Sequence, residues 1–457
     1  MTKKKQAPNK ILWIFAIGQL GWSILSAIMS NWLVYFYQPS EENIEAGQTL
    51  FITQSPIFLG LTVIGLIAAF GRIFDAVTDP LVAGFSDRCK SRLGRRIPFM
   101  RYAAIPFSLV TILVFISPVQ SKTAVNGVSL FVTSMLFYLC MTLYCTPYNA
   151  LIPELGKTQN ARINLSTYIS ITFFFGTALA YLVPNIAGFF EDSLGHVNSF
   201  RLTVAILSAI ACLCMLFPAF LIDEKEYADT TPSQTPAFKS LVKTFRNSSF
   251  RTFVASDIMY WIALTMFQTG LPFYITVLMK LDDGMSFVFF ALMTVLSLIL
   301  YPFVNILAKK LGKKKLVMFA FVFFSFVFLI TAFCGTLGIG GIVWGAAISA
   351  LASIPMAILG ILPQAIVADI AESDSIETKE NREGMFYAAR TFAFKLGQSI
   401  AMLVFTSVAK IGKEGYGYRL SAIIAALLCL GGGIIFLFYN EKKVFSVIEK
   451  NKFIDKK

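Results

Sequence analysis

The sequence predicts an all-helical integral membrane protein with twelve transmembrane helices in two pseudo-symmetric six-helix bundles and with both termini in the cytosol. Composition is the first reason, because 56% of the 457 residues are hydrophobic and only 14% are charged, whereas soluble domains carry about 25% charge. Secondly, the apolar residues gather in runs of about 20, the length of a helix that crosses a bilayer. The chain shows no ten-residue alternation of apolar and polar residues, which favours helices over an outer-membrane barrel.

Twelve apolar spans follow one another along the chain. The first begins after the basic stretch MTKKKQAPNK, and its apolar run is too long for a signal peptide. In order, the spans lie near residues 11–37, 57–86, 99–118, 128–152, 165–189, 201–222, 252–279, 285–308, 315–335, 341–368, 385–409 and 419–440. This pattern predicts a multi-pass protein of the plasma or inner membrane, surrounded by the lipid bilayer.

The basic charge of the chain is explained by topology. Lys and Arg number 39 against 26 Asp and Glu, a net charge of +13, which in a soluble protein would suggest a nucleic-acid partner. With a cytosolic N-terminus, about 30 of the basic residues fall on the cytosolic side, as the positive-inside rule requires. The first loop on the other side carries three glutamates and no basic residue. We therefore expect no nucleic-acid partner.

The chain divides into matched halves. A polar segment, residues 223–249, separates six spans from six, so we expect an N-terminal bundle over 1–222, a cytosolic linker over 223–249 and a C-terminal bundle with a cytosolic tail over 250–457. A basic turn built around a glycine follows the second span (SDRCKSRLGRR) and the eighth (AKKLGKKK). Ordinary positive-inside charge explains either turn alone, but their matched positions favour the parallel duplication of major-facilitator transporters. One such chain encloses its own pathway, so we expect a functional monomer.

The second span carries charges at membrane depth. Arg72, Asp75, Thr78 and Asp79 share one helix face in AAFGRIFDAVTDPLVAGF. Ionisable groups at this depth are costly and mark functional sites. Two carboxylates with hydroxyls suit a sodium ion, and without a metal their repulsion favours uptake of a proton. The alternative is a helix end that dips into cytosolic water at Asp79.

Span eleven contains the other deep charges, Arg390 and Lys395. Lys395 lies among phenylalanines, cannot easily reach either surface, and is expected to find its charge partner in the span-two carboxylates. Asp257 in span seven is expected to be interfacial and is left out of the core site. Further polar residues in spans one, four and five predict a wet interior that contacts substrate, although a plain helix kink explains any one of them equally well: Trp22, Ser23, Thr142, Tyr144, Cys145, Asn149 and Ser170.

Charged residues on the cytosolic side suggest a gate. The basic turn of one half and an acidic segment of the other are expected to pair when the inside is shut and to separate when it opens. Positive-inside charge plus a solvated acidic loop is the alternative. The predicted gate residues are Arg88, Arg92, Arg95, Arg96, Glu372, Asp374, Glu377 and Glu383.

Catalysis and resident cofactors are not expected. The only histidine, His196, falls in a short predicted loop, and the seven cysteines show no paired spacing. Neither a metal cluster nor a nucleophile with a nearby base follows from these residues. The sequence therefore predicts no enzyme and no cofactor beyond a coupling ion, Na⁺ or H⁺.

Three motifs resemble the glycoside-pentoside-hexuronide cation symporter family of the major facilitator superfamily: GRIFDAVTDP in span two, SDRCKSRLGRRIPF after it, and ADIAESDSIETKENREG before span eleven. The resemblance covers nearly the whole chain. It implies cation-coupled transport by alternating access, with Asp75 and Asp79 as cation carboxylates, Thr78 beside them and Thr142 as the span-four hydroxyl. Lys395 falls on the family's span-eleven lysine.

The sugar-binding positions match this family less well. Ser23 and Cys145 replace two acidic residues of its sugar-transporting members, Asn149 replaces an aromatic residue, and Ser170 replaces an arginine. Arg390 stands where a glutamine is usual. The resemblance therefore implies cation symport of a sugar, glycoside or uronide, and leaves open a non-sugar substrate such as a lysophospholipid or another organic anion. An uncoupled facilitator or a scramblase is the alternative of another class.

Overall fold

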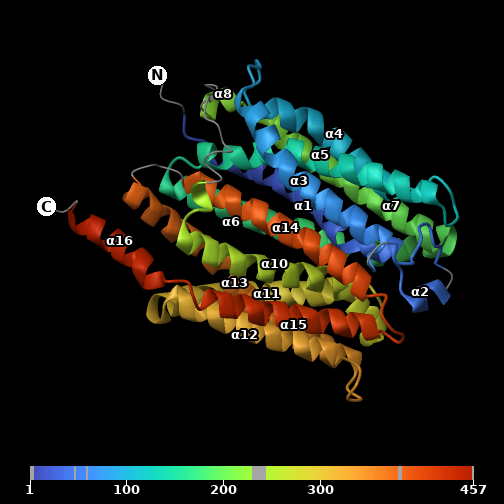
Figure 1. Cartoon of the computed structure of the whole chain (residues 1–457). Coiled ribbons are helices and arrows are strands. Elements are labelled where there is room, and N and C mark those ends of the chain that lie inside the picture. The colour runs from blue at the N-terminus through green and yellow to red at the C-terminus, as the bar shows by residue number, and fades with distance from the viewer. Residues whose placement is uncertain (1–4, 46–47, 58–59, 229–242, 379–382, 455–457) are drawn as a thin grey trace. The chain divides into compact units, whose positions relative to one another are not determined.

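The computed structural model describes residues 5–45, 48–57, 60–228, 243–378 and 383–454. Within these ranges the chain is helical and contains no strand, only an isolated bridge between Ser91 and Gly94. The long helices lie along one another in bundles, with short loops at their ends (Figure 1). The prediction of an all-helical protein is confirmed.

The described helices belong to two compact units. The first unit holds six long helices: α1 (Asn9–Tyr37), α3 (Val63–Asp87), α4 (Ile97–Val114), α5 (Ala124–Leu155), α6 (Gln159–Tyr181) and α7 (Val183–Leu221). Two short helices, α2 (Glu41–Glu45) and α8 (Glu224–Tyr227), accompany them.

The second unit repeats this plan. Its long helices are α10 (Ser248–Phe273), most of α11 (Met285–Leu311), α12 (Lys313–Ala332), α13 (Gly341–Thr378), α14 (Glu383–Val408) and α15 (Tyr416–Phe436). A π-helical turn, η1 (Tyr274–Leu278), continues α10, and α16 (Glu441–Ile454) follows α15.

Helix packing inside the two units follows the same pattern. In the first unit α1 packs on α6 and α7, while α4 packs on α5 and α7. In the second, α10 packs on α14 and α15, while α12 packs on α13 and α15. Each of these four contacts of the first unit thus has its counterpart six long helices later, as a parallel duplication requires.

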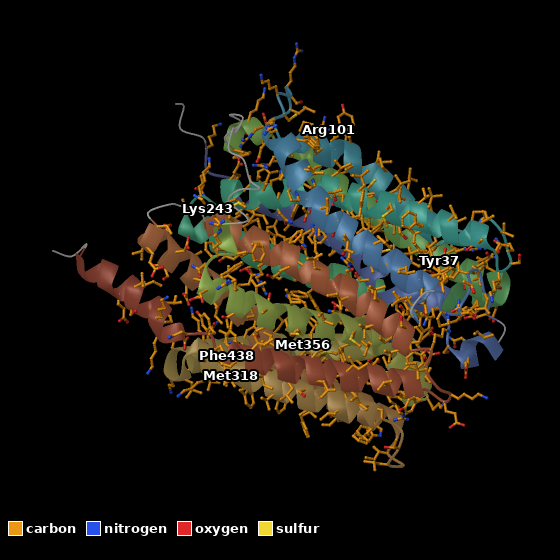
Figure 2. All side chains as sticks on the ribbon, in the orientation of Figure 1. Tyr37, Arg101, Lys243, Met318, Met356 and Phe438 are labelled. Carbon is orange, nitrogen blue, oxygen red and sulfur yellow. The ribbon has the colours of Figure 1, made fainter. Side chains whose placement is uncertain are left out.

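Ten segments among the described residues are long and apolar enough to cross a membrane, and one of them, Asn164–Leu221, joins α6 and α7. The helix α3 is not among the ten because it carries Arg72, Asp75 and Asp79. Many large apolar side chains on α4, α7, α11 and α12 are exposed, as expected where a lipid-facing surface replaces a polar one. Phe438, just after α15, is 78% exposed (Figure 2).

Polar contacts to backbone carbonyls fix the helices of the first unit to one another. The Tyr37 hydroxyl donates to the Val114 carbonyl at 2.6 Å, which ties the end of α1 to the end of α4 (Figure 2). At the other end of α4, the Arg101 guanidinium donates to the Ala219 carbonyl of α7 and lies over the Phe220 ring at 4.1 Å (Figure 2). These bonds satisfy carbonyls that helix ends leave open.

Two segments differ from the sequence-based boundaries. The loop expected before residue 201 is helical, because α7 begins at Val183 and runs through a break at Gly195, whose φ of 73° suits glycine. His196 lies just after this break and is exposed. The predicted linker 223–249 begins with α8 and ends in the start of α10, while residues 229–242 lie outside the described part of the chain.

Candidate functional site

The charged face of α3 is turned into the first unit. Arg72, Asp75 and Thr78 are buried, and Asp75 is 0% exposed. Close packing explains how α5 reaches this face, because a Cβ on Gly71 would meet the Tyr138 ring of α5 at 2.2 Å. The glycine therefore lets α3 and α5 approach at the level of the charges. The alternative of a solvated helix end does not fit Asp75.

Two threonines of α5 bond to the two carboxylates of α3, and Thr78 lies beside one of them. Thr142 of α5 donates to Asp75 Oδ1 at 2.8 Å, and its hydroxyl lies 3.2 Å from that of Thr78. One turn further along both helices, Thr146 donates to Asp79 Oδ1 at 3.0 Å. The structure thus brings together all four residues of the predicted cation site and adds Thr146, which sequence reasoning missed. The shared i, i+4 spacing of Asp75 with Asp79 and of Thr142 with Thr146 is the signal that could have found it.

Arg72, the predicted coupling residue, lies beside this cluster. Its Nη2 donates to Ser30 of α1 at 2.8 Å, and its guanidinium lies 5.3 Å from the Tyr138 ring centroid. Arg72 is thereby anchored to α1 and α5.

The chemistry of the cluster suits a hard monovalent cation or a proton. Its donors are carboxylate and hydroxyl oxygens, the ligand type that Na⁺ requires. No group of three or more His, Cys, Asp or Glu residues in the described ranges is placed so that it could hold a metal ion, so a cation here would need the hydroxyls to complete its coordination shell. Hydroxyl groups that now bond to carboxylates can turn their lone pairs toward a cation.

The predicted substrate residues of the first unit occupy different environments. Asn149 and Ser170 are exposed, and the Ser170 hydroxyl donates to the Ser166 carbonyl. Tyr144 is fully buried and donates to the Met215 carbonyl of α7 at 3.0 Å. The Tyr144 hydroxyl is therefore already satisfied within the first unit.

Three further candidates of this group lie on α1 and α5. Ser23 is buried where α1 meets α6, because a Cβ on Gly176 would come within 1.9 Å of its hydroxyl. Trp22 and Cys145 are half-buried, and the buried indole Nε1 of Trp22 has no hydrogen-bond partner in the described ranges. Of the six, Asn149, Ser170 and Trp22 are thus the best placed to contact a ligand.

In the second unit, Arg390 of α14 meets Asp257 of α10. The guanidinium donates two hydrogen bonds to the carboxylate, from Nε to Oδ2 at 2.8 Å and from Nη2 to Oδ1 at 3.1 Å. Arg390 and Asp257 are 7% and 5% exposed, so Asp257 is buried between helices, and its interfacial depth remains a prediction. A buried arginine needs an acid within reach, and this requirement could have identified Asp257 from the sequence. Lys395 is buried on the same helix, and its pairing with the span-two carboxylates remains a prediction.

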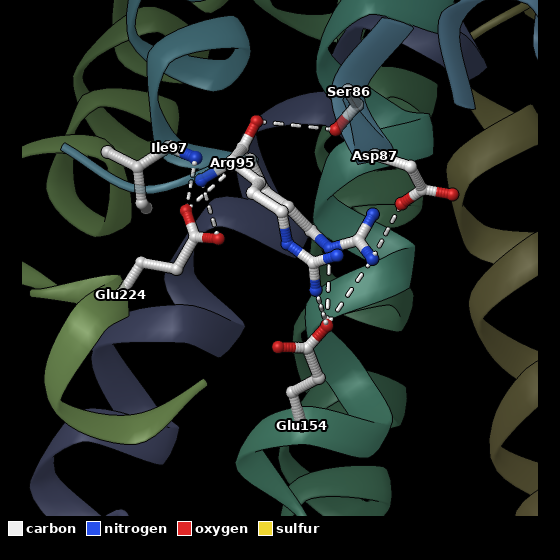
Figure 3. A network of polar contacts seen from close by, with 7 residues as sticks. Ser86, Asp87, Arg95, Ile97, Glu154 and Glu224 are labelled. Atoms are coloured by element: carbon white, nitrogen blue, oxygen red, sulfur yellow. Dashed lines mark hydrogen bonds and ion pairs between the residues drawn. The ribbon is translucent and has the colours of Figure 1, made fainter. Parts of the chain in front are cut away.

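The predicted gate residues split into buried and exposed members. Arg95 and Arg96 are buried, and both guanidiniums contact Glu154 of α5 at 3.3 to 3.4 Å (Figure 3). Arg96 also pairs with Asp87 at 3.0 Å. These partners all belong to the first unit.

Glu224 of α8 belongs to the same network and contacts the turn between α3 and α4. It is 0% exposed, and its carboxylate accepts the backbone N–H groups of Arg95, Arg96 and Ile97 at 2.8 to 2.9 Å (Figure 3). A Cβ on Gly94 would come within 2.3 Å of that carboxylate. A negative charge at the first turn of α4 also favours the helix dipole.

The remaining gate candidates have these positions. Arg88, Arg92, Glu372 and Glu377 are exposed, and Asp374 is buried and accepts from Asn247 Nδ2 at 3.0 Å. The side chain of Glu383 lies outside the described part of the chain. Pairing between the two halves remains a prediction.

The second unit contains a counterpart of the Glu224 contact. Glu441 of α16 accepts the backbone N–H groups of Lys313 and Lys314 at 3.0 and 3.3 Å, at the start of α12. Gly312 has a φ of 86°, and a Cβ there would meet Glu441 at 3.2 Å. Lys313 pairs with Asp369 of α13 at 2.5 Å, as the arginines of the first unit pair with α5. The matched glycine turns therefore have matched partners.

Comparisons with known proteins agree with this architecture. Residues 14–426 match the family described as MFS/sugar transport protein. The uncharacterized symporter YnaJ of Bacillus subtilis is 24% identical over 91% of this chain and 85% of its own. A putative sulfoquinovose importer of Escherichia coli is 24% identical over 88% of this chain and 81% of its own. A crystal structure of a D-xylose–proton symporter superposes with a TM-score of 0.70, at 15% identity over 95% of this chain and 98% of its own, which supports the fold.

The comparisons decide several expectations made from the sequence. The major-facilitator fold and the resemblance to glycoside-pentoside-hexuronide symporters are confirmed. So is the prediction of a multi-pass membrane protein, and the bacterial source of the relatives indicates the plasma membrane. The family consists of transporters rather than enzymes. The chain is a membrane transporter that belongs to the MFS/sugar transport protein family of the major facilitator superfamily.

Proposed function

We propose that the protein is a symporter that couples the movement of a cation, Na⁺ or H⁺, to the uptake of a sugar or glycoside by alternating access. The observation that carries this proposal is the cluster of Asp75, Thr78, Thr142, Asp79 and Thr146 between α3 and α5. Two acids at membrane depth that bond to hydroxyls are costly to keep, and binding a cation offsets that cost. A protein that moved sugar without a cation would not need them.

Coupling follows from linkage. If the cation raises the affinity for substrate, then substrate raises the affinity for the cation by the same factor. Binding of one unit charge at Asp75 and Asp79 removes their repulsion and reduces the charge that must cross the membrane with the substrate. The proposed action on Lys395 is that neutralisation of these carboxylates frees or reorients its ammonium group.

The substrate class rests on the family and its symporter-named relatives. We place sugars and glycosides first, with sulfoquinovose as one candidate because a relative bears that name. Lysophospholipids and other organic anions are the rival substrates, and the same assay tests them.

The test uses purified protein in liposomes. Uptake of labelled glucosides, galactosides, xylosides, sulfoquinovose and lysophosphatidylcholine is measured with an imposed sodium gradient, an imposed proton gradient, or none. We expect gradient-driven accumulation of at least one sugar, and its loss in Asp75→Asn. Exchange of labelled for unlabelled sugar at equal concentrations needs no gradient, so it shows whether the variant still binds and moves substrate.

Uptake that ignores both gradients in the wild-type protein contradicts symport and favours an uncoupled facilitator. Coupled uptake that Asp75→Asn and Asp79→Asn leave unchanged contradicts the cation site. Thr133→Val serves as the matched control, because the Thr133 hydroxyl on α5 bonds only within its own helix, to Ser129 and Leu130.

A further inference from the structure

The interface of α10 and α14 is built as a ladder of side-chain pairs, one pair per helical turn. Asp257, Trp261, Thr265 and Thr269 lie on α10 at i, i+4, i+8 and i+12, and Arg390, Phe394, Gln398 and Met402 repeat this spacing on α14. Residues four apart lie one above the other on a helix face. Equal spacing on two packed helices therefore sets the pairs in register.

In three of the four pairs, the two side chains contact each other. Arg390 bonds to Asp257 at 2.8 Å, the ring of Trp261 stacks on that of Phe394 at 4.6 Å between centroids, and Thr269 Oγ1 donates to Met402 Sδ at 3.7 Å. Each of these contacts satisfies a polar group or covers a ring.

The third pair, Thr265 and Gln398, has buried polar atoms without a hydrogen-bond partner in the described ranges. Thr265 is 4% exposed, and neither its Oγ1 nor the Oε1 of Gln398 has a hydrogen-bond partner in the described ranges, although both atoms are buried. The buried Nε1 of Trp261, one turn away, has no partner there either. A buried polar atom without a partner is costly, so three of them on adjoining turns form a group that a polar ligand could satisfy.

The donor and acceptor chemistry defines that ligand. The indole N–H only donates, the Gln398 oxygen only accepts, and the threonine hydroxyl does both. A sugar hydroxyl donates and accepts, so neighbouring hydroxyls of one ring satisfy all three groups, while the Trp261 indole offers an apolar face. A carboxylate cannot donate to Gln398, and the charge of Arg390 is already matched by Asp257.

The duplication adds an independent argument. Trp22 and Trp261 occupy the same position in α1 and α10, counted from Asn9 and Ser248. Trp22 likewise lies near a phenylalanine of the partner helix, Phe173 of α6, at 6.3 Å, and its buried Nε1 also lacks a partner in the described ranges. In each unit, a tryptophan whose indole N–H has no hydrogen-bond partner in the described ranges thus lies beside a phenylalanine. One of these two tryptophans, Trp22, is already a predicted substrate residue.

We propose that Trp261, Thr265 and Gln398 form the second unit's sugar-binding subsite, which recognises hydroxyl groups of a neutral glycoside. The inference rests on the proposed function and narrows it, because it sets neutral glycosides above the uronides that Arg390 suggested from the sequence. Arg390 is then a positioning residue that holds α14 against α10.

The experiment measures binding of nitrophenyl glucoside, galactoside, xyloside and glucuronide to the purified full-length protein by equilibrium dialysis. We expect a neutral glycoside to bind more tightly than the glucuronide. Thr265→Val, Gln398→Leu and Trp261→Phe should each raise its Kd about tenfold or more, since each removes one hydrogen bond to a buried hydroxyl. All three should fold, because deleting an unpartnered buried polar atom is neutral or stabilising.

Thr269→Val is the matched control, one turn further along α10, and should leave the Kd within about twofold of wild type because the Thr269 hydroxyl already has its partner. Ion-dependent thermal stabilisation through Asp75 should be unchanged in all four variants. Unchanged Kd values in the three subsite variants, or tighter binding of the glucuronide, would overturn the inference while leaving symport intact. If the wild-type protein binds and transports none of these sugars, the proposed function fails as well.

Discussion

The two units give their buried acids different hydrogen-bond partners. On α3, Asp75 accepts a hydrogen bond from the Thr142 hydroxyl of α5, which is a neutral group. On α10, Asp257 is held by both arms of the Arg390 guanidinium. A hydroxyl is a neutral donor and does not balance the charge of the carboxylate that it contacts, whereas an arginine does. The comparison therefore distinguishes a hydrogen bond from a neutral donor, on α3, from an ion pair that ties two helices together, between α10 and α14.

Breaking the Asp257–Arg390 pair should have the largest effect on stability. Asp257→Ala leaves a buried arginine without its acid, so we expect a loss of about 3 to 5 kcal/mol in the free energy of unfolding. Thermal unfolding of the purified protein measures it. The double variant Asp257→Leu with Arg390→Met, which removes both charges, should recover most of the loss. A single variant as stable as wild type would show that the pair does not hold the helices.

The same kind of change at Asp75 should act on function instead. Asp75→Asn keeps the size of the side chain and an oxygen that can accept from Thr142, so we expect a change of about 1 kcal/mol or less in stability. Stabilisation by Na⁺ or by acidic pH should disappear. Titration of the melting temperature with NaCl, and with pH, checks this. An Asp75→Asn protein that still responds to the ion would place the cation elsewhere.

The carboxylates below the two glycine turns offer the next contrast. Glu224 is fully buried and accepts three backbone N–H groups, while Glu441 is half-buried and accepts two. Replacing a cap costs about 0.5 to 2 kcal/mol, and more where the N–H groups lose access to water. Glu224→Ala should therefore destabilise more than Glu441→Ala in parallel thermal unfolding. Equal losses would contradict the role of burial.

The arginines of the first turn should divide according to exposure. Arg88 and Arg92 are exposed, so Arg88→Ala and Arg92→Ala should leave stability within about 0.5 kcal/mol while altering the rate of uptake if they pair across the halves. Arg96→Ala removes a buried partner of Asp87 and Glu154, so its main expected effect is a lower free energy of unfolding. Side-by-side melting and uptake measurements distinguish these outcomes. Transport unaffected by Arg88→Ala and Arg92→Ala together would remove both from the gate.

The smallest effect is expected at the Lys5–Glu226 pair. The hydrogen bond and charge of Lys5 hold the pKa of Glu226 below its ordinary value. A lowered carboxyl pKa contributes stability that is present above the ordinary pKa of 4.5 and is lost as the pH falls through the lowered value. Both side chains lie in solvent, which screens the pair. Melting curves of Glu226→Gln between pH 4 and 7 should therefore overlay those of wild type, and a clear shift would contradict this.

Patterns along one helix were enough to predict that the acids of α3 lie together on one face. Asp75, Thr78 and Asp79 share a face because helical spacing demands it, and the cost of charge in a membrane marks that face as functional. Thr142 came from the family resemblance, and Thr146 was missed because hydroxyls at membrane depth are common. Sequence position alone does not say which hydroxyl on a facing helix meets which acid.

The partners of the arginines were not predicted from the sequence. Arg390 pairs with Asp257, which lies more than a hundred residues away on another helix. Arg95 and Arg96 contact Glu154 of their own unit, and Arg96 also contacts Asp87, while their role in a gate stays a prediction. The sequence shows that an arginine carries a positive charge, but which acid neutralises that charge depends on helix packing.

By itself, the sequence determined that this protein spans a membrane as a duplicated helical bundle, because hydropathy, charge asymmetry and repeats are properties of local segments. Only the tertiary structure decided which polar groups are satisfied and which are open. That distinction separates Thr269 from Thr265, and the same packing gives Asp257 an arginine and Asp75 a threonine as partner. Hydrogen bonds and ion pairs between helices depend on distances of a few ångströms, which helix packing sets and the order of residues along one helix does not reveal.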